Sequence, residues 1–289
     1  MRAMSLALFS VLFIVAGVAG AEEPPKSGHP VFDRAVELVM EHFYDPSALE
    51  HFSEAVRKEV EDAEEPLTVD STDDRLDAAI DTVLASLGVS HTGRYKPDTI
   101  AYYELADIFR YALRRDMRRL FPPDGEASYE GIGMVAEEVS GKLFVSDVYD
   151  GAPADRAGIE TGDEILSVDG ASYHEIESFR GKAGKTVELR LRRQEGAESV
   201  TRSVEVERLR PLQTFSRAIE ESAKAVEYHG YRIGYVRLWT LSTRDGMDIV
   251  ARALAAGPLK DTSGVVVDLR GRWGGGRADA AELFVGDTV

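Results

Sequence analysis

The sequence predicts an α+β protein of several domains, in which a helical N-terminal segment precedes a small β-domain and the start of a parallel α/β layer. Apolar residues recur at spacings of three and four over residues 30–121. Alternating apolar and polar runs, separated by glycine turns, fill residues 128–210. A strand, a helix, a second strand and a glycine-rich turn then follow within residues 211–289.

The N-terminus has the pattern of a secretory signal. Arg2 precedes an apolar run at residues 6–18, and small residues at 19–21 offer a cleavage site. We therefore expect a signal peptide at 1–21, a polar linker at 22–29, and an exported protein in the periplasm or cell envelope. The apolar run is short for a helix that spans a membrane, which favours a cleaved signal. The alternative is an uncleaved segment that anchors the protein, and this is the only membrane association that we expect.

Composition excludes several kinds of chemistry. The chain has no Cys, so disulfides, thiolate catalysis and cysteine metal sites are excluded. Its formal charge of −17 opposes nucleic-acid binding, and we interpret this charge as favouring solubility. His174 and Glu175 match half of a His-Glu-x-x-His zinc motif, but Ser178 stands where the second His belongs. We expect no metal and no cofactor.

Four helices are predicted in the N-terminal region. Pro46 ends the first, and Gly88 is a plausible cap after the third. The second half of the fourth is rich in arginine, which we interpret as a solvated face; a docking face for the acidic helices before it is the alternative. The predicted helices cover residues 31–43, 49–63, 70–87 and 98–120.

The glycine phrase at 131–134 is the most informative part of the β-domain. Gly131 and Gly133 allow sharp turning, so that successive N–H groups point one way and form an anion site. The following run, through residue 139, is a candidate exposed strand edge. A strand edge beside such a set of N–H groups suits an extended peptide that ends in a carboxylate.

Other turns and strands of the β-domain follow from local signals. Pro153 begins a short helical turn that Gly158 closes, and Asp169-Gly170 predicts a tight turn. Strands are predicted at residues 143–148, 186–192 and 199–205.

Residues 129–207 resemble a PDZ domain of the bacterial protease type. The phrases Gly-Ile-Gly-Met, Gly-Ala-Pro-Ala-Asp-Arg-Ala-Gly-Ile and Gly-Asp-Glu-Ile-Leu-Ser-Val-Asp-Gly occur in the order typical of that family. The alternative, a generic small β-domain, explains each glycine singly but not their joint order. The resemblance implies that the N–H groups of the loop hold a peptide carboxylate and that a helix near residues 173–179 forms the other wall of the groove. The peptide-binding residues so implied are Gly131, Ile132, Gly133 and Met134.

The last part of the chain predicts the beginning of an α/β core. Residues 213–226 form a helix or an extended connection. Strands at 231–238 and 265–269 flank a helix at 244–256, and a glycine turn then leads to a helix at 278–284. N–H groups at such a turn can hold an oxyanion. The alternative is an ordinary glycine-rich turn between a strand and a helix.

Together with the PDZ-like segment, this core resembles the tail-specific, or C-terminal-processing, serine peptidases, whose catalytic core is of the ClpP and crotonase type. Their phrase Asp-Leu-Arg-Gly-Asn-Pro-Gly-Gly is matched from Asp268, but Arg272 and Trp273 replace the Asn-Pro. The triple glycine is nearer to the related tricorn-core branch. The resemblance implies that Gly274 and Gly275 supply oxyanion-hole N–H groups.

The same resemblance covers a phrase at residues 89–95. In tricorn-like members a Ser-His pair at this place supplies the catalytic base, which implies His91 as general base, oriented by Ser90. In the other branch a Lys is the base and this His is structural. A loop histidine bonded to backbone is a further alternative.

The nucleophilic Ser of both branches follows the glycine phrase by one strand, and no residue here matches it. We therefore expect the chain to be an N-terminal piece of a longer protein, or a product that ends early. The function implied is an exported serine endopeptidase that captures protein or peptide C-termini with its PDZ domain and is catalytically incomplete as given. The alternative is a non-catalytic PDZ-bearing periplasmic peptide-binding protein or an inactive remnant. The sequence leaves the oligomeric state open.

Overall fold

A computed structural model describes residues 24–89 and 92–274. The chain divides into two compact units, Met1–Arg94 and Tyr95–Val289. The helical region expected at 30–121 is thus split, and its last helices belong with the second unit rather than the first. Within the described ranges, no helix combines the length and the apolar character that crossing a membrane requires.

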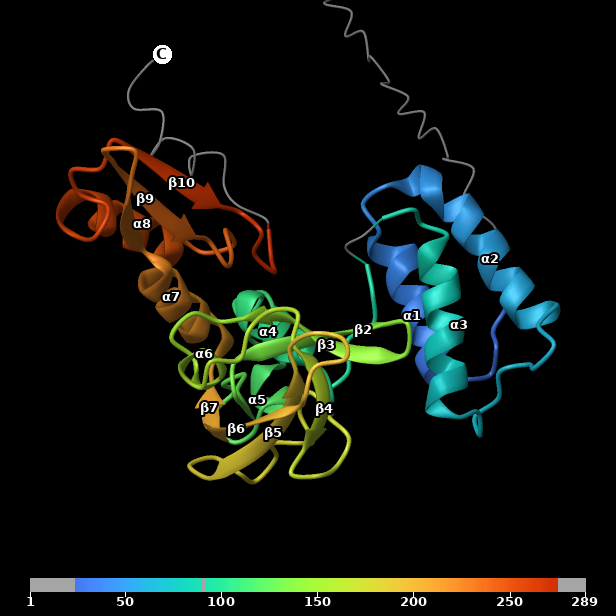
Figure 1. The fold of residues 1–289 in the computed structure, drawn as a ribbon. Coiled ribbons are helices and arrows are strands. Elements are labelled where there is room, and N and C mark those ends of the chain that lie inside the picture. Colours follow the sequence, from blue (N-terminus) through green and yellow to red (C-terminus); the bar gives the residue numbers. More distant parts are fainter. Residues whose placement is uncertain (1–23, 90–91, 275–289) are drawn as a thin grey trace, which may run out of the picture. The chain divides into compact units, whose positions relative to one another are not determined.

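The first unit is a bundle of three helices that lie side by side (Figure 1). They are α1 (Pro30–His42), α2 (Leu49–Glu61) and α3 (Asp73–Ala85), with a 3₁₀ turn at Pro46–Ala48. Phe32, Phe52 and Ile80 are fully buried between them. The Thr72 hydroxyl caps α3 by accepting from the Arg75 N–H, and Gly88 follows the helix with φ of +65°. These helices confirm the sequence prediction to within three residues at each end.

The prediction of a single helix at residues 98–120 is wrong. The structure forms α4 (Ile100–Ile108) and the short α5 (Met117–Leu120), joined by turns. A continuous helix would stack Arg110, Arg114 and Arg118 at i,i+4 spacing, where like charges repel. The break instead leaves Arg110 3.6 Å from Asp107 in an ion pair within the turn region.

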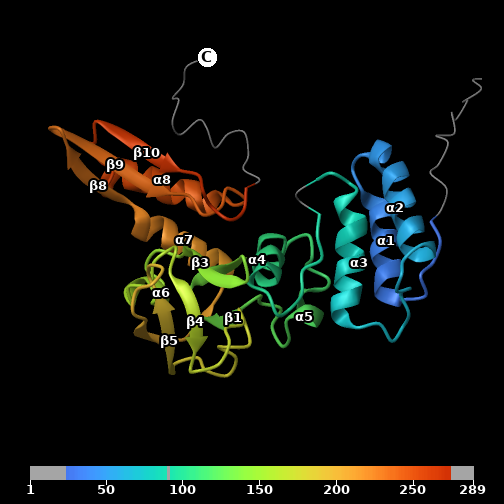
Figure 2. The ribbon, with the colours of Figure 1, turned by 45° about the vertical axis from the view of Figure 1, so that its right-hand side comes forward.

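The centre of the second unit is a five-stranded antiparallel sheet in the order β2-β3-β4-β5-β6. Figure 2 labels β3, β4 and β5 of this sheet. Its inner face is filled by fully buried aliphatic side chains such as Val187, Leu189 and Leu191, which alternate with exposed residues along β5. The strands are β2 (Met134–Val139), β3 (Lys142–Val148), β4 (Glu164–Val168), β5 (Thr186–Arg192) and β6 (Val200–Glu205).

Shorter elements complete this domain. β1 (Tyr129–Gly131) pairs antiparallel with β7 (Glu207–Leu209), and α6 (Pro153–Arg156) starts at the proline, as the sequence predicts. Asp169 and Gly170 both have positive φ, which confirms the tight turn.

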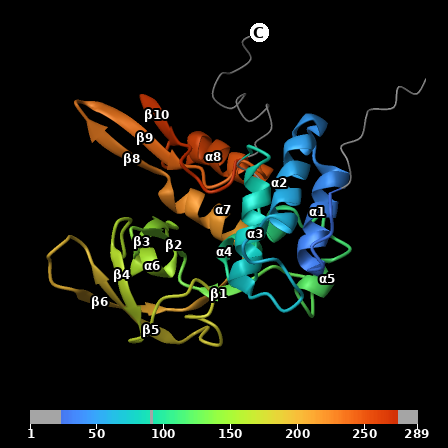
Figure 3. The same ribbon diagram turned by 90° about the vertical axis from the view of Figure 1, so that its right-hand side faces the viewer.

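The remaining elements form the start of an α/β layer. α7 (Pro211–Ser222) leads into β8 (Lys224–Tyr228), β9 (Tyr231–Arg237), α8 (Arg244–Ala256) and β10 (Gly264–Asp268). β9 lies between β8 and β10, antiparallel to the first and parallel to the second, and α8 lies along one face of this sheet (Figure 3). The predicted parallel strand pair is confirmed. The segment left open at 213–226 is mostly helix, followed by a strand.

One hydrophobic cluster joins the β-domain to this layer. Tyr149 and Ala152, which follow β3, pack with Phe215 of α7 and Trp239 after β9. The Tyr149 and Trp239 rings meet edge to face with centroids 4.7 Å apart. The end of β9 is thereby packed against the segment that connects β3 to α6.

Candidate functional site

The loop that precedes β2 is held in place through its carbonyl groups. The Ile132 carbonyl accepts from the Ala154 N–H at 2.8 Å, and the Gly133 carbonyl accepts from the Tyr149 N–H at 3.0 Å. Gly133 has φ of +75°, a conformation that glycine adopts without strain. Its α-carbon faces Ala152 so closely that a Cβ would overlap the methyl group there. The loop therefore has a fixed conformation that requires a glycine at 133.

The N–H groups of the same loop are not engaged. Among the described residues, neither the Ile132 N–H nor the Gly133 N–H has a hydrogen-bond partner, although both residues are buried. Buried N–H groups are nearly always paired in folded proteins, by ligand or water where protein does not serve. This pair of donors is thus the feature of the β-domain that most clearly indicates a ligand.

Gly131 has a different role from the one expected. It lies in β1, opposite Glu207, and does not have a positive φ. A Cβ at this position would lie 2.8 Å from the Tyr129 ring. Glycine is required there by close packing, so the expectation that Gly131 itself forms the turn is wrong, and the turn is made at Gly133.

β2 is an edge strand, as the sequence predicts. In the described sheet it pairs only with β3. Met134 at its start is buried in the core, whereas Glu137 and Glu138 near its end are exposed. The open edge therefore begins directly beside the unpaired N–H groups of Ile132 and Gly133.

A pocket of about 500 Å³, here called the β2 pocket, opens beside this strand. Ala136 of β2 and Leu143 of β3 form its apolar side. The opposite side is polar and comes from the residues before α4 and from the segment after the Asp169-Gly170 turn. The polar lining consists of Asp98, Thr99, Tyr173, His174, Glu175 and Glu177.

The helix expected at 173–179 is absent; residues 175–181 form turns. The apolar residues of this segment are drawn to separate clusters, Ile176 to the one beside α4 and Phe179 to the core of the sheet. The Ser178 hydroxyl also accepts from the His174 N–H, closing a local turn. So short a segment cannot offset the cost of nucleating a helix when tertiary contacts oppose it.

Asp98 and Thr99, which directly precede α4, take part in the pocket wall in place of that helix. The Glu175 carboxylate accepts from the Ile100 N–H at 2.8 Å, at the N-terminus of α4. Burial raises the pKa of Glu175, and this hydrogen bond opposes the increase. The Tyr173 hydroxyl is buried without a partner among the described residues, and burial raises its pKa.

The second candidate site is the turn after β10, residues 269–274, here called the post-β10 turn. The Trp239 carbonyl accepts from the Arg272 N–H at 3.1 Å. At Gly271 a Cβ would lie 2.6 Å from the Trp239 carbonyl oxygen, so this glycine permits the close approach of two backbone segments. Gly274 is exposed, and nothing lies within 4 Å of its Cβ position.

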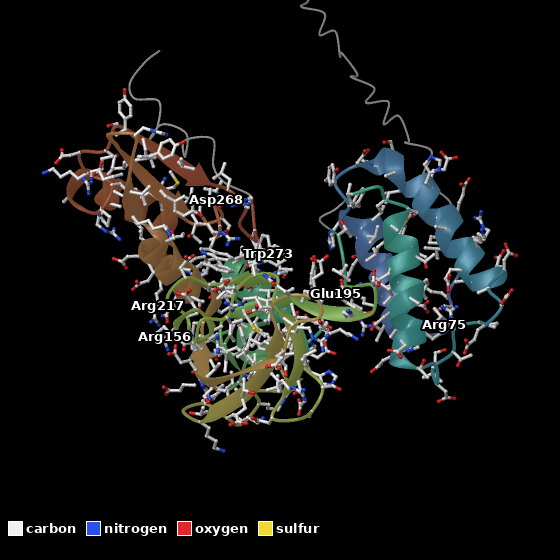
Figure 4. The ribbon with its side chains drawn as sticks, in the orientation of Figure 1. Arg75, Arg156, Glu195, Arg217, Asp268 and Trp273 are labelled. Atoms are coloured by element: carbon white, nitrogen blue, oxygen red, sulfur yellow. The ribbon has the colours of Figure 1, made fainter. Side chains whose placement is uncertain are left out.

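Asp268 fixes the start of the turn. Its buried carboxylate accepts from Arg270 Nη2 at 2.6 Å and from the Tyr235 hydroxyl at 2.9 Å. The hydrogen bonds from Arg270 hold the pKa of Asp268 well below its usual range. Figure 4 shows Asp268 at the end of β10 and Trp273 further along the same turn. Asp268 is therefore a charged structural anchor at the base of the post-β10 turn.

A buried carboxylate on α4 contacts the last part of the post-β10 turn. Glu104 is 1% exposed, and its Oε2 accepts from Arg272 Nε and from Trp273 Nε1, each at 2.8 Å. Its other oxygen accepts from the Tyr149 hydroxyl. Burial disfavours the charge on Arg272, but the Glu104 carboxylate outweighs this effect and raises the pKa of Arg272 above its usual value.

Sequence reasoning missed Glu104 and Tyr149. The available signal was a glutamate four residues after the buried Ile100, on the packed face of a helix. Of the predicted catalytic residues, Ser90, His91 and Gly275 lie outside the described residues. Their roles, and that of Gly274, stay predictions. Arg156 and Arg217, labelled in Figure 4, pair with Glu207 and belong to neither site.

One protein family of known fold matches part of this chain. The PDZ domain family matches residues 144–193, within the five-stranded sheet and its connections. The chain therefore contains a PDZ domain, as the order of the three glycine phrases predicts.

Sequence alignment extends the relationship beyond the PDZ domain. Carboxy-terminal processing protease CtpB of Bacillus subtilis (strain 168) is 28% identical over 186 residues, which cover 62% of this chain and 37% of the relative. Carboxyl-terminal-processing peptidase 3, chloroplastic, of Arabidopsis thaliana is 27% identical over 195 residues, covering 63% of this chain and 37% of the relative. The predicted similarity to carboxy-terminal processing proteases is confirmed. The matched part spans little more than a third of the length of these relatives.

A solved structure of a photosystem II D1 C-terminal processing protease aligns with 90% of this chain and 64% of its own. Its TM-score is 0.48 and its sequence identity is 21%.

Proposed function

We propose that this chain captures the free C-terminal ends of polypeptides and belongs to an exported serine protease. The peptide end lies along β2 as an added strand. The Ile132 and Gly133 N–H groups donate to its terminal carboxylate, with Met134 beginning the strand that receives it. Upstream side chains of the peptide enter the β2 pocket. The names of the relatives, which are carboxy-terminal processing proteases, support this proposal.

One observation carries the peptide-capture proposal. The N–H groups of two buried residues, Ile132 and Gly133, have no partner among the described residues, and they stand at the start of an open strand edge. A carboxylate is the group that satisfies several converging N–H donors at once, and charge-assisted hydrogen bonds of this kind are about twice as strong as neutral ones. An extended peptide also supplies backbone groups to β2, so both unsatisfied features are met by one ligand.

The test compares peptides with a free C-terminus and the same peptides with a C-terminal amide. Calorimetric titration into the chain should give micromolar binding, about −8 kcal/mol, for the free carboxylate. Amidation removes the charge that the Ile132 and Gly133 N–H groups hold, so the affinity should fall at least tenfold. Equal affinity for the two peptides across a library of tails would refute carboxylate capture.

The proteolytic part of the proposal concerns the post-β10 turn. A peptide bond under attack by a Ser hydroxyl develops negative charge on its carbonyl oxygen, and N–H groups near glycines stabilise that charge. We assign this role to Gly274, whose surroundings are open, and to Gly275. We assign Ser90 and His91 to the same tricorn-like set, with His91 as base; the nucleophilic Ser of that set has no match in this chain. A turnover assay and fluorophosphonate labelling, on this chain and on any longer form of the protein, test the activity separately from peptide binding.

Export rests on the apolar N-terminal segment at residues 6–18. N-terminal sequencing of the protein recovered from a secreting host tests it. A mature protein that begins near residue 22 supports cleavage, and retention of Met1 in a soluble cell fraction would contradict it.

A further inference from the structure

We propose that Glu104 is a positioning residue for the post-β10 turn, acting through Arg272 and Trp273. The inference rests on the proposed function only in giving the turn a role as an oxyanion site. The Glu104 carboxylate, which lies on α4 and is distant in sequence, fixes the backbone conformation of residues 272–274.

The geometry of the contact supports this role. Arg272 Nε and Trp273 Nε1 both donate to Glu104 Oε2 at 2.8 Å, and the Arg272 side chain is only 18% exposed. Two successive side chains of the turn are therefore held by a single buried atom. An ion pair shielded from water depends strongly on geometry, so movement of the turn would leave a buried charge uncompensated.

The backbone of the post-β10 turn is held by hydrogen bonds of its own. On one side the Trp239 carbonyl accepts from the Arg272 N–H, and the Trp273 carbonyl accepts from the Leu241 N–H at 3.4 Å. These bonds tie the turn to the segment after β9. Glu104 ties the same two residues to α4 through their side chains.

The first measurement uses the two tryptophans of the chain. Trp239 is fully buried and Trp273 is partly exposed, so acrylamide quenching of fluorescence reports chiefly on Trp273. Glu104→Gln keeps the shape of the side chain and removes its charge. We expect it to raise the quenching constant of the Trp273 fluorescence at least twofold and to speed amide hydrogen exchange in residues 270–274 at least tenfold. Exchange in β5 serves as the internal reference for global stability.

Glu175→Gln is the matched control. Glu175 is also a carboxylate that contacts α4, through the Ile100 N–H; burial raises its pKa and the charge of Arg272 opposes this increase, but among the described residues no hydrogen bond joins Glu175 to the turn. We expect this variant to leave the Trp273 quenching and the exchange of residues 270–274 unchanged. If it alters them as much as Glu104→Gln does, Glu104 acts only by stabilising α4 and the proposal is overturned.

A second variant background, in which the turn lacks its donors to Glu104, separates the positioning role of Glu104 from a general effect on packing. In Arg272→Met/Trp273→Phe, which lacks both donors to Glu104, adding Glu104→Gln should not speed exchange of the turn further. An equal acceleration in both backgrounds would overturn the proposal. Should Glu104→Gln not fold, Trp273→Phe removes one donor at the partly exposed end of the contact, and the same tenfold faster exchange is expected; wild-type exchange rates would overturn the proposal. None of these readouts depends on peptide capture or hydrolysis, so the proposed function can fail without affecting them.

Discussion

The α-carbon of Gly133 faces the methyl group of Ala152 with no room for a Cβ between them. This contact packs the loop before β2 against the N-terminal end of α6 and leaves the Ile132 and Gly133 N–H groups without a partner among the described residues. The loop is consequently rigid on its carbonyl side and available on its N–H side, which is the arrangement that a preformed anion site needs.

Replacing Gly133 by Ala should damage this loop in two ways. The positive φ of +75° is strained for alanine, and the new Cβ meets Ala152. We expect destabilisation of about 1–3 kcal/mol and loss of measurable binding to tail peptides. Chemical unfolding and calorimetric titration measure the two effects.

Gly141→Ala provides the control for that variant. Gly141 has a similar φ of +76°, but nothing lies within 4 Å of its Cβ position, and it sits in the turn between β2 and β3. The Gly141→Ala variant should be somewhat less stable than the wild type and should keep the wild-type peptide affinity. If both variants bind peptide equally well, the loop at Gly133 is not the carboxylate site.

Filling the β2 pocket should weaken peptide binding without unfolding the protein. Ala136 is half-buried and lines the pocket of about 500 Å³. An indole at this position would occupy the space that we assign to an upstream side chain of the peptide. We expect Ala136→Trp to raise the Kd about tenfold, or about 1.4 kcal/mol. Val139→Trp, on the same strand but outside the pocket lining, should bind like the wild type; equal losses would contradict the assignment.

Asp163 and Arg193 should make the stability of the PDZ domain depend on pH. Arg193 Nε and Nη2 each donate at 2.9 Å to the two oxygens of the buried Asp163 carboxylate. Burial would raise the pKa of Asp163, but these bonds outweigh it and lower the pKa below its usual value of 3.8. A carboxyl group with a lowered folded-state pKa stabilises the fold above its unfolded-state pKa, and this contribution is lost as the pH falls through the folded-state pKa.

We therefore expect Arg193→Gln to lower the Tm at pH 7, and the difference from wild type to shrink below about pH 4. Thermal unfolding followed by circular dichroism at both pH values measures this. The control is Arg190→Gln on β5, three residues earlier, where Arg190 Nε donates to the Ser199 hydroxyl and, among the described residues, to no carboxylate. A deficit of the same size at pH 7 and pH 3 would show that charge is not its origin.

Arg237 should be sensitive even to a conservative change. Its guanidinium lies 3.8 Å from the centre of the Trp239 ring, and Nη2 donates to Asp147 and to the Arg270 carbonyl, each at 2.6 Å. A lysine keeps the charge but cannot stack and donate in several directions at once. We expect Arg237→Lys to lower the free energy of unfolding by about 1 kcal/mol, measured in urea. Arg232→Lys, also on β9 but bonded to backbone carbonyls, should lose less.

Elements with local signals were predictable from the sequence. α8 begins and ends at the predicted residues because Gly257-Pro258 ends it and its apolar positions repeat at helical spacing. β5 follows from strict alternation of buried and exposed residues. The loop before β2 was predictable because its backbone conformation requires a glycine at 133.

Features that depend on distant contacts were not predictable. The break between α4 and α5 and the absence of a helix at 173–179 both arise where tertiary packing or charge repulsion opposes a helical pattern. Glu104 was missed for the same reason, since Arg272 and Trp273, which bind it, lie far along the chain. A single sequence shows the apolar face of α4 but not which polar groups it meets.

The free edge of β2 also has a consequence for self-association. Unpaired strand edges are templates on which two copies of a chain can join and aggregate. Glu137 and Glu138 are exposed on this strand, and an antiparallel meeting of two copies would set like charges opposite one another. The strand can thus leave its edge unpaired while disfavouring fibres formed from copies of this chain.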